Sequence, residues 1–173
     1  IHVDLYLELA TLHQHRRDYD LSIQHTQKVI DHCSIDQHPL RWMHAYLLWG
    51  TTLNHQRQYS DALDKLLSIE PFIADKITAE ARWIPIELYN VLCALYLEQG
   101  KYNKAMNAIE KGLWHAKQGR FPKSQSELYF QLSKIKILQG FHREGLPIAH
   151  KALQITQSTG DIYNEARILL TVG

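Results

Sequence analysis

The chain has 173 residues, of which 45% are hydrophobic and 21% charged, and it contains 8 glycines and 5 prolines. This composition is typical of a globular domain and excludes a disordered or fibrous chain. Because 19 basic residues nearly balance 18 acidic ones, the formal net charge of +1 gives no strong attraction to nucleic acid or to an anionic membrane. We therefore expect no direct nucleic-acid binding by this segment.

The cysteines and the apolar runs indicate in which cellular compartment the protein is found. Cys33 and Cys93 lie in different predicted helices, and two cysteines cannot form the dense disulfide framework of a small secreted domain. No apolar run approaches the roughly 20 residues of a membrane-spanning helix, and the start of the chain lacks the regions of a signal peptide. We expect a cytoplasmic protein without a membrane span. The first residue is not Met and lies in a predicted helix, so we expect a fragment of a longer protein.

One pattern of a tyrosine, a bulky residue and a small residue occurs four times along the chain. The copies are Tyr6-Leu9-Ala10, Tyr46-Trp49-Gly50, Tyr89-Leu92-Cys93 and Tyr129-Leu132-Ser133. Their small residues follow one another at intervals of 40, 43 and 40 residues, and a period of this length indicates a helical array. The predicted repeats span residues 3–38, 39–78, 79–121 and 122–160, with a partial fifth over 161–173.

Within each repeat, the spacing of apolar residues predicts two helices. In the third repeat, Leu88, Leu92 and Leu95 recur at the three- and four-residue spacing of an amphipathic helix, which Gly100 ends. A second helix begins near Tyr102, and Gly119 closes it. In the fourth repeat, Ser124 and Glu127 form a predicted capping box, Gly140 ends the first helix, and the second ends near Gly160.

The positions of the prolines also predict where helices begin, bend or end. Pro39 and Pro122 fall at predicted helix starts, where a missing N–H costs little. Pro85 predicts either the start of a helix or a kink, and Pro147 predicts a late helix start or a kink. Pro71 is expected to end the second repeat.

The recurring small residues indicate where the paired helices cross, because closely approaching backbones leave room only for a small side chain. The predicted contact points on the first helices are Ala10, Gly50, Cys93 and Ser133. Those that face them from the second helices are Ser22, Ala62, Ala105 and Gly145.

The segment from Tyr89 to Ala105, Tyr-Asn-Val-Leu-Cys-Ala-Leu-Tyr-Leu-Glu-Gln-Gly-Lys-Tyr-Asn-Lys-Ala, resembles the tetratricopeptide repeat. The other copies depart from that pattern, for example through Arg17 and Arg57 where a turn glycine is expected. The resemblance implies an all-α fold, a right-handed α-solenoid in which one array of antiparallel helix pairs extends over residues 1–173. The first helices would line its concave groove.

The resemblance also implies which residues line that groove. In the first repeat they are Asp4, Leu7, Thr11 and Gln14. In the other repeats, the residues expected to bind a peptide or protein partner are His44, Leu47, Thr51, Asn54, Glu87, Asn90, Leu97, Glu127, Phe130 and Lys134. Amides such as Asn90 can grip a peptide backbone, and Leu47 and Phe130 could seat apolar side chains. The alternative is a solvated surface without a ligand. The Lys and Asn that clamp a terminal carboxylate in chaperone-binding members are not found at the matching positions.

Catalysis and metal binding have little support in the sequence. Among the eleven histidines, His13 and His15 point to nearly opposite sides of a helix, and His44 and His55 would lie about 16 Å apart along a helix. We find no nucleophile elbow, phosphate-binding glycine loop or pair of catalytic carboxylates. We therefore expect no enzyme activity, no metal and no cofactor.

The repeat length of about 40 residues resembles a long-repeat subclass of the tetratricopeptide family. That subclass includes bacterial peptide-pheromone receptors and transcription regulators of the Rap, Rgg and PlcR-like group, in which a DNA-binding or effector domain precedes the array. The resemblance implies a sensor or regulatory part of such a signalling protein. A general scaffold or adaptor for protein assembly is the alternative, and a homodimer formed through the last repeat stays open.

Overall fold

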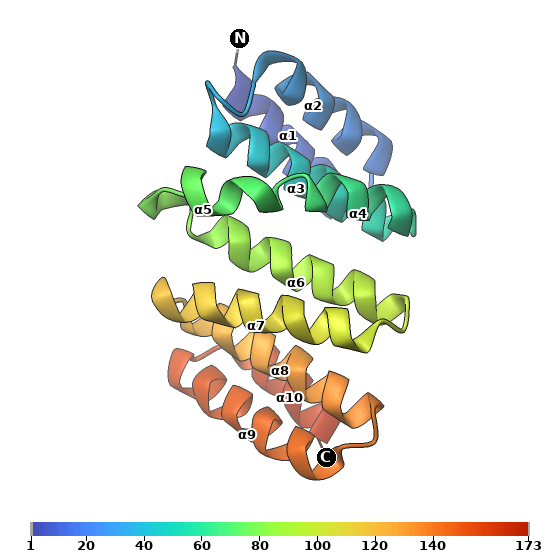
Figure 1. Ribbon diagram of the computed structural model, residues 1–173, viewed down its shortest axis with the longest axis vertical. Coiled ribbons are helices and arrows are strands. Elements are labelled where there is room, and N and C mark those ends of the chain that lie inside the picture. Colours follow the sequence, from blue (N-terminus) through green and yellow to red (C-terminus); the bar gives the residue numbers. More distant parts are fainter. Residues whose placement is uncertain (1, 173) are drawn as a thin grey trace. The chain divides into compact units, whose positions relative to one another are not determined.

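The computed structural model describes residues 2–172, and in that range every regular element is helical, which confirms the all-α class. The chain forms two compact units, Ile1–Ile84 and Pro85–Gly173. Figure 1 shows the order of the helices along the chain. That the repeats form a single array stays a prediction.

The first unit contains two helix pairs followed by short helical turns. Its elements are α1 (Val3–His15), α2 (Tyr19–His32), α3 (Pro39–His55), α4 (Tyr59–Leu67), the 3₁₀ turn η1 (Glu70–Phe72), α5 (Ile73–Lys76) and the 3₁₀ turn η2 (Ala79–Ala81). Helix α1 packs on α2, α3 packs on α4, and α2 also packs on α3. Their core includes Ala10, Val29 and Ala45, each 0% exposed. Removal of apolar surface from water is the main force that holds these helices together.

The second unit continues the pairing. Its elements are α6 (Trp83–Glu98, which starts with the last two residues of the first unit), α7 (Tyr102–Gln118), α8 (Pro122–Leu138), α9 (His142–Thr159) and α10 (Ile162–Val172). Helix α8 packs on both α7 and α9, and α10 packs on α9. Leu88, Ile109 and Leu128 are completely buried, one on each of α6, α7 and α8.

The turns inside the four helix pairs share one backbone conformation. Arg17, Arg57, Gly100 and Gly140 have positive φ angles of 65°, 61°, 67° and 84°. In the first turn, Asp18 N–H donates to the His13 carbonyl at 2.9 Å and Arg17 N–H donates to the Gln14 carbonyl at 3.1 Å, the hydrogen bonds of a Schellman motif. The two arginines therefore occupy the left-handed position that glycine takes in the later pairs.

The predicted contacts of small residues at the helix crossings are confirmed for three of the four pairs, and in the third pair both residues are buried. The Ser22 hydroxyl donates to the Ala10 carbonyl at 2.9 Å, and a Cβ added to Gly50 would lie 3.3 Å from the Ala62 carbonyl oxygen. In the fourth pair, a Cβ on Gly145 would lie 3.2 Å from the Ser133 carbonyl oxygen. Cys93 and Ala105 of the third pair are both 0% exposed.

Several helix boundaries differ from the sequence predictions. The capping box is wrong, because α8 begins at Pro122 and its N-cap, Phe121, makes no side-chain capping bond. Pro147 lies inside α9, which begins at His142, so the late start is also wrong. Helix α7 does end before Gly119, but the residue with positive φ in that turn is Arg120.

Three of the other four prolines fit their predicted places, whereas Pro71 does not end a helix. Pro39 and Pro122 occupy the first position of α3 and α8. Pro85 falls in the first turn of α6, so this helix starts there, as one of the two predicted alternatives required. Pro71 lies in η1, beyond the end of α4 at Leu67.

Candidate functional site

A pocket of about 550 Å³ lies in the first unit. It is bounded by the first turns of α1, the start of α3 and the segment that leads into α6. Leu7, Leu40 and Ile84 provide apolar walls. The polar or aromatic residues are Asp4, Gln37, His38, Arg41, His44, Thr78, Glu80 and Trp83. Apolar walls with a few polar groups are typical of ligand sites in proteins.

An ion pair joins two adjacent first helices at this pocket. The Arg41 Nε donates to Asp4 Oδ1 at 2.7 Å, and its Nη2 donates to Asp4 Oδ2 at 2.8 Å. This hydrogen bonding by Arg41 holds the pKa of Asp4 below its usual value. Because the two side chains are 43% and 72% exposed, the pair contributes little to stability. The two parallel hydrogen bonds to Asp4 instead fix the orientation of the Arg41 guanidinium.

An aromatic pair forms another wall. The ring of Trp83 meets the ring of His44 edge to face, with centroids 4.9 Å apart and planes at 83°. Trp83 is 37% exposed, so one part of the indole stays accessible to a ligand. Burial lowers the pKa of His44, which favours the neutral imidazole.

A second pocket of about 210 Å³ lies in the second unit, between α6, α8 and α10. Glu87 and Asn90 reach it from α6, Glu127 from α8, and Asn164 from α10. Its walls also include Lys123 and Ser124 at the start of α8. This pocket brings together three residues that the tetratricopeptide pattern assigned to partner binding.

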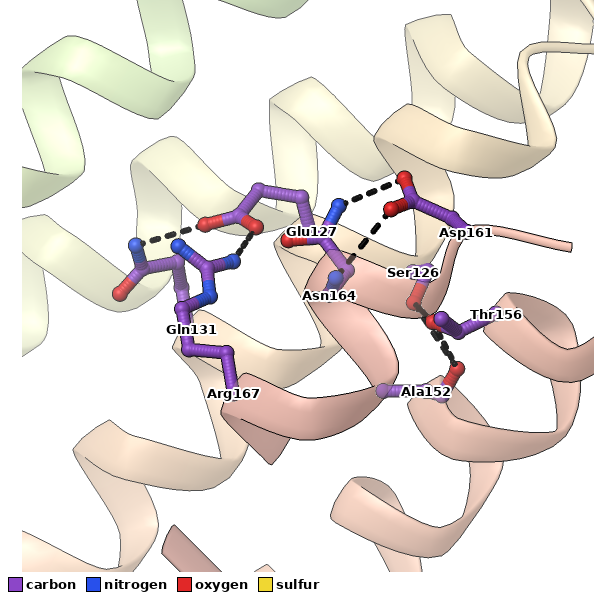
Figure 2. A network of polar contacts seen from close by, with 8 residues as sticks. All are labelled: Ser126, Glu127, Gln131, Ala152, Thr156, Asp161, Asn164 and Arg167. Carbon is purple, nitrogen blue, oxygen red and sulfur yellow. Dashed lines mark hydrogen bonds and ion pairs between the residues drawn. The ribbon is translucent and has the colours of Figure 1, made fainter. Parts of the chain in front are cut away.

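Polar contacts beside the second pocket fix α10 to α8, as Figure 2 shows. Both oxygens of Glu127 are engaged: Oε1 accepts from Gln131 Nε2 at 3.0 Å, and Oε2 accepts from Arg167. At the start of α10, the Asp161 carboxylate accepts from the Asn164 backbone N–H at 3.2 Å and from its side-chain amide at 2.8 Å. Those hydrogen bonds lower the pKa of Asp161.

The ten predicted binding residues divide between the two units. His44 lies in the first pocket, and Glu87, Asn90 and Glu127 lie in the second. Leu47 and Phe130 are 3% exposed and offer a ligand little accessible surface. Lys134 lies over the Phe130 ring at 5.8 Å, the Thr51 hydroxyl donates to the Leu47 carbonyl at 2.7 Å, and Asn54 and Leu97 are half-buried. A role in binding stays a prediction for all ten.

The sequence reasoning missed Arg41, Trp83, Asn164 and Arg167. A signal for two of them lies in the repeat period. Arg41 follows its partner Asp4 by 37 residues, and Arg167 follows Glu127 by 40. Opposite charges about one repeat apart therefore indicate contacts between consecutive first helices.

In residues 2–172 no group of three or more His, Cys, Asp or Glu side chains is placed to hold a metal ion. Over the same range, no helix combines the length and the apolar character needed to cross a lipid bilayer.

The fold defines a class: an all-α protein built from consecutive helix pairs with a repeated turn and a repeated crossing. No family model matches the chain, and no curated protein matches its sequence. Among solved structures, the chain is similar to the crystal structure of MamA protein, with 18% sequence identity and a TM-score of 0.37, over 92% of this chain and 94% of that one. At this level of likeness, no conclusion about function passes from one protein to the other.

Proposed function

We propose that the chain is a non-catalytic module that binds a segment of polypeptide through the exposed sides of its first helices. The observation that carries the proposal is the pocket of about 550 Å³ in the first unit. An extended polypeptide presents apolar side chains and backbone amides together, so its site needs apolar seats beside fixed hydrogen-bonding groups.

Both kinds of group occur in this pocket. The accessible part of Trp83 suits an apolar or aromatic side chain, because aromatic surfaces bury a large area at a small cost in conformational entropy. The Arg41 guanidinium has five N–H donors, and Asp4 takes two of them. The others are available to a backbone carbonyl or a carboxylate of the ligand. The fork to Asp4 orients the guanidinium before the ligand arrives, which reduces the entropy cost of binding.

A more specific proposal is that this module is the sensor or regulatory part of a cytoplasmic bacterial signalling protein or transcription regulator. It rests on the resemblance of the repeats to the long tetratricopeptide subclass. The alternative is a scaffold that assembles other proteins. The sequence of the complete reading frame would distinguish the regulator from the scaffold, because the regulator requires a DNA-binding or effector segment and the scaffold does not.

Peptide selection tests the binding function. The purified chain is immobilised and exposed to a displayed library of random peptides, and the affinity of recurring sequences is measured by fluorescence polarisation. We expect Trp83→Ala to weaken a selected peptide about 10-fold or more, as truncation of an aromatic anchor commonly does. Trp114→Ala is the matched control, because Trp114 is 59% exposed on α7 and lies outside this pocket.

Two results would contradict the proposal. One is a selection that yields no recurring sequence. The other is a set of selected peptides that bind equally well to Trp83→Ala, Arg41→Ala and the unmodified chain, with circular dichroism showing unchanged helix content in each variant. Either result would remove the first pocket as the binding site.

A further inference from the structure

Helix α10 carries four large apolar side chains that face solvent. Ile162, Tyr163, Leu169 and Leu170 are 78%, 77%, 49% and 87% exposed. Together with the exposed Ala166 they form the α10 stripe. The members of the stripe follow one another at spacings of one, three, three and one residues, so they lie on one face of the helix. A contiguous exposed apolar face is typical of a surface that another molecule covers.

The polar side chains of α10 hold the α10 stripe in its outward orientation. Glu165 accepts a hydrogen bond of 2.9 Å from the Gln157 side chain on α9. Arg167 binds Glu127 on α8, as Figure 2 shows. Rotation of α10 about its own axis would break both contacts and expose Ile168, which is 1% exposed. The stripe is therefore an outer face of the folded chain.

The α10 stripe has the layout of a helix crossing inside this chain. Where α3 crosses α4, Gly50 leaves room for a close approach and Leu66 packs against it. Ala166 takes the central position of the stripe, with one pair of bulky residues a turn before it and another pair a turn after it. A small side chain lets two backbones approach closely, and bulky neighbours fill the grooves beside the contact. The stripe thus fits a second helix that crosses at Ala166.

The order of residues in the α10 stripe favours a second copy of α10 over an unrelated helix. Counted from Ala166, bulky residues stand three and four positions away in both directions, so the stripe reads alike from either end. A two-fold interface uses the same patch on both subunits, and an antiparallel pair would bring Ile162 against Leu170 of the second copy. Tyr163 would likewise meet Leu169. None of the five residues is charged, so self-pairing brings no like charges together.

We infer that the chain forms a two-fold dimer in which α10 packs antiparallel on α10 of a second copy and crosses it at Ala166. The dimer does not depend on the proposed function, because none of the residues that line the pocket of the first unit belongs to α10. The stripe is one face of an eleven-residue helix, smaller than the roughly 800 Å² that each partner of a stable complex contributes. We therefore expect a reversible dimer with a dissociation constant on the order of 10–100 µM.

Sedimentation equilibrium of the purified chain, from about 5 to about 500 µM to bracket this constant, tests the dimer. The mass should rise with concentration from that of one chain to that of two. Leu170→Glu buries an unpaired charge in the interface and should weaken association about 10-fold or more. Ala166→Arg should do the same, because a bulky group enters the crossing. Leu5→Glu is the matched control, since Leu5 is 53% exposed on α1 and should leave association unchanged.

A double variant tests the antiparallel orientation. With Ile162→Lys and Leu170→Glu in the same chain, each introduced cation meets an introduced carboxylate of the other copy. The double variant should therefore associate more tightly than either single variant, and this gain should disappear at about 1 M salt. A parallel pair would instead place like charges opposite each other and make the double variant the weakest.

Four results would overturn the inference. The first is the mass of a single chain at every concentration, which would leave the α10 stripe to a different partner. The second is a dimer that Leu170→Glu and Ala166→Arg leave intact while circular dichroism shows unchanged helix content. The third is a dimer lost in Leu5→Glu, which would place the contact on α1. The fourth is a double variant that associates no better than the single variants.

Discussion

The hydroxyl of Ser22 on α2 donates a hydrogen bond of 2.9 Å to the Ala10 carbonyl oxygen on α1, and both residues are completely buried. The same hydroxyl lies 3.2 Å from the hydroxyl of Thr52 on α3, which accepts from the Gln14 side chain at 2.9 Å. One small polar residue thus joins the two helices of the first pair and connects them to the second pair.

Replacement of Ser22 by alanine should lower the free energy of unfolding by about 1 kcal/mol, because a buried hydrogen bond is lost with almost no change in volume. Urea denaturation followed by circular dichroism measures the change. Ser60→Ala is the control, since Ser60 is exposed on α4. Equal stability of the two variants would contradict a structural role for the Ser22 hydroxyl.

Gly50→Ala should destabilise the fold by about 1–3 kcal/mol through overpacking, although alanine favours a helix over glycine by about 1 kcal/mol. The added Cβ would lie 2.5 Å from Leu66 Cγ and 2.7 Å from its Cδ2, at a fully buried crossing. Gly112→Ala meets its nearest atoms at 3.2–3.3 Å and should be close to neutral. Thermal unfolding of both variants checks the difference, and a stabilised Gly50→Ala would show that the crossing has spare room.

The turns with a residue at positive φ allow two reciprocal substitutions, arginine to glycine in one turn and glycine to arginine in another. Arg57→Gly should raise the free energy of unfolding by up to about 1 kcal/mol, because a residue with a Cβ is strained at positive φ. The greater freedom of glycine in the unfolded chain offsets part of that gain. Gly100→Arg, in the corresponding turn of the third pair, should be destabilising by a similar amount. Chemical denaturation measures both, and a loss of stability in Arg57→Gly would mean that the arginine side chain itself supports the turn.

The attachment of α10 should depend on Arg167, which binds Glu127 and lies 5.1 Å from the centre of the Phe130 ring. Arg167→Met should make the amides of α10 exchange with solvent several-fold faster, with a cost on the order of 1 kcal/mol because the pair is partly exposed. Hydrogen exchange resolved by helix measures this effect. Arg143→Met, at an exposed position of α9, is the matched control and should leave the exchange of α10 unchanged.

Stability should fall as the pH drops below about 6.5, because burial lowers the pKa of His44 and of His115 from 6.5 in the folded chain. Below pH 6.5 these histidines bind more protons in the unfolded chain than in the folded chain. The free energy of unfolding therefore decreases as the pH falls, until the pH is below their lowered pKa in the folded chain. The raised pKa of Glu87 acts in the opposite sense at lower pH, because its protonation is favoured in the folded state. Melting temperatures from pH 8 to 5.5 should be level at first and then decline. His44→Gln should make the decline shallower, and an unchanged curve would contradict the role of His44.

The sequence by itself determined the fold class and the pairs of small residues at three of the four crossings. Periodicity and the size of residues such as Ala10 and Gly50 are local or repeated properties, and they are visible without coordinates. It also indicated that Glu87, Asn90 and Glu127 belong to one face, since their register within the repeat is fixed. The capping box at Ser124 failed because the rigid φ of Pro122 already begins the helix two residues earlier.

Only the tertiary structure decided which of those face residues remain accessible. Leu47 and Phe130 occupy groove positions by register but are buried, because burial depends on neighbouring helices that the repeat pattern does not describe. The meeting of Trp83 with His44 and the unsatisfied oxygen of Asn90 likewise depend on how different helices approach one another. Register along a helix follows from the chain alone, whereas exposure, pairing and unsatisfied hydrogen bonds follow from packing between segments far apart in sequence.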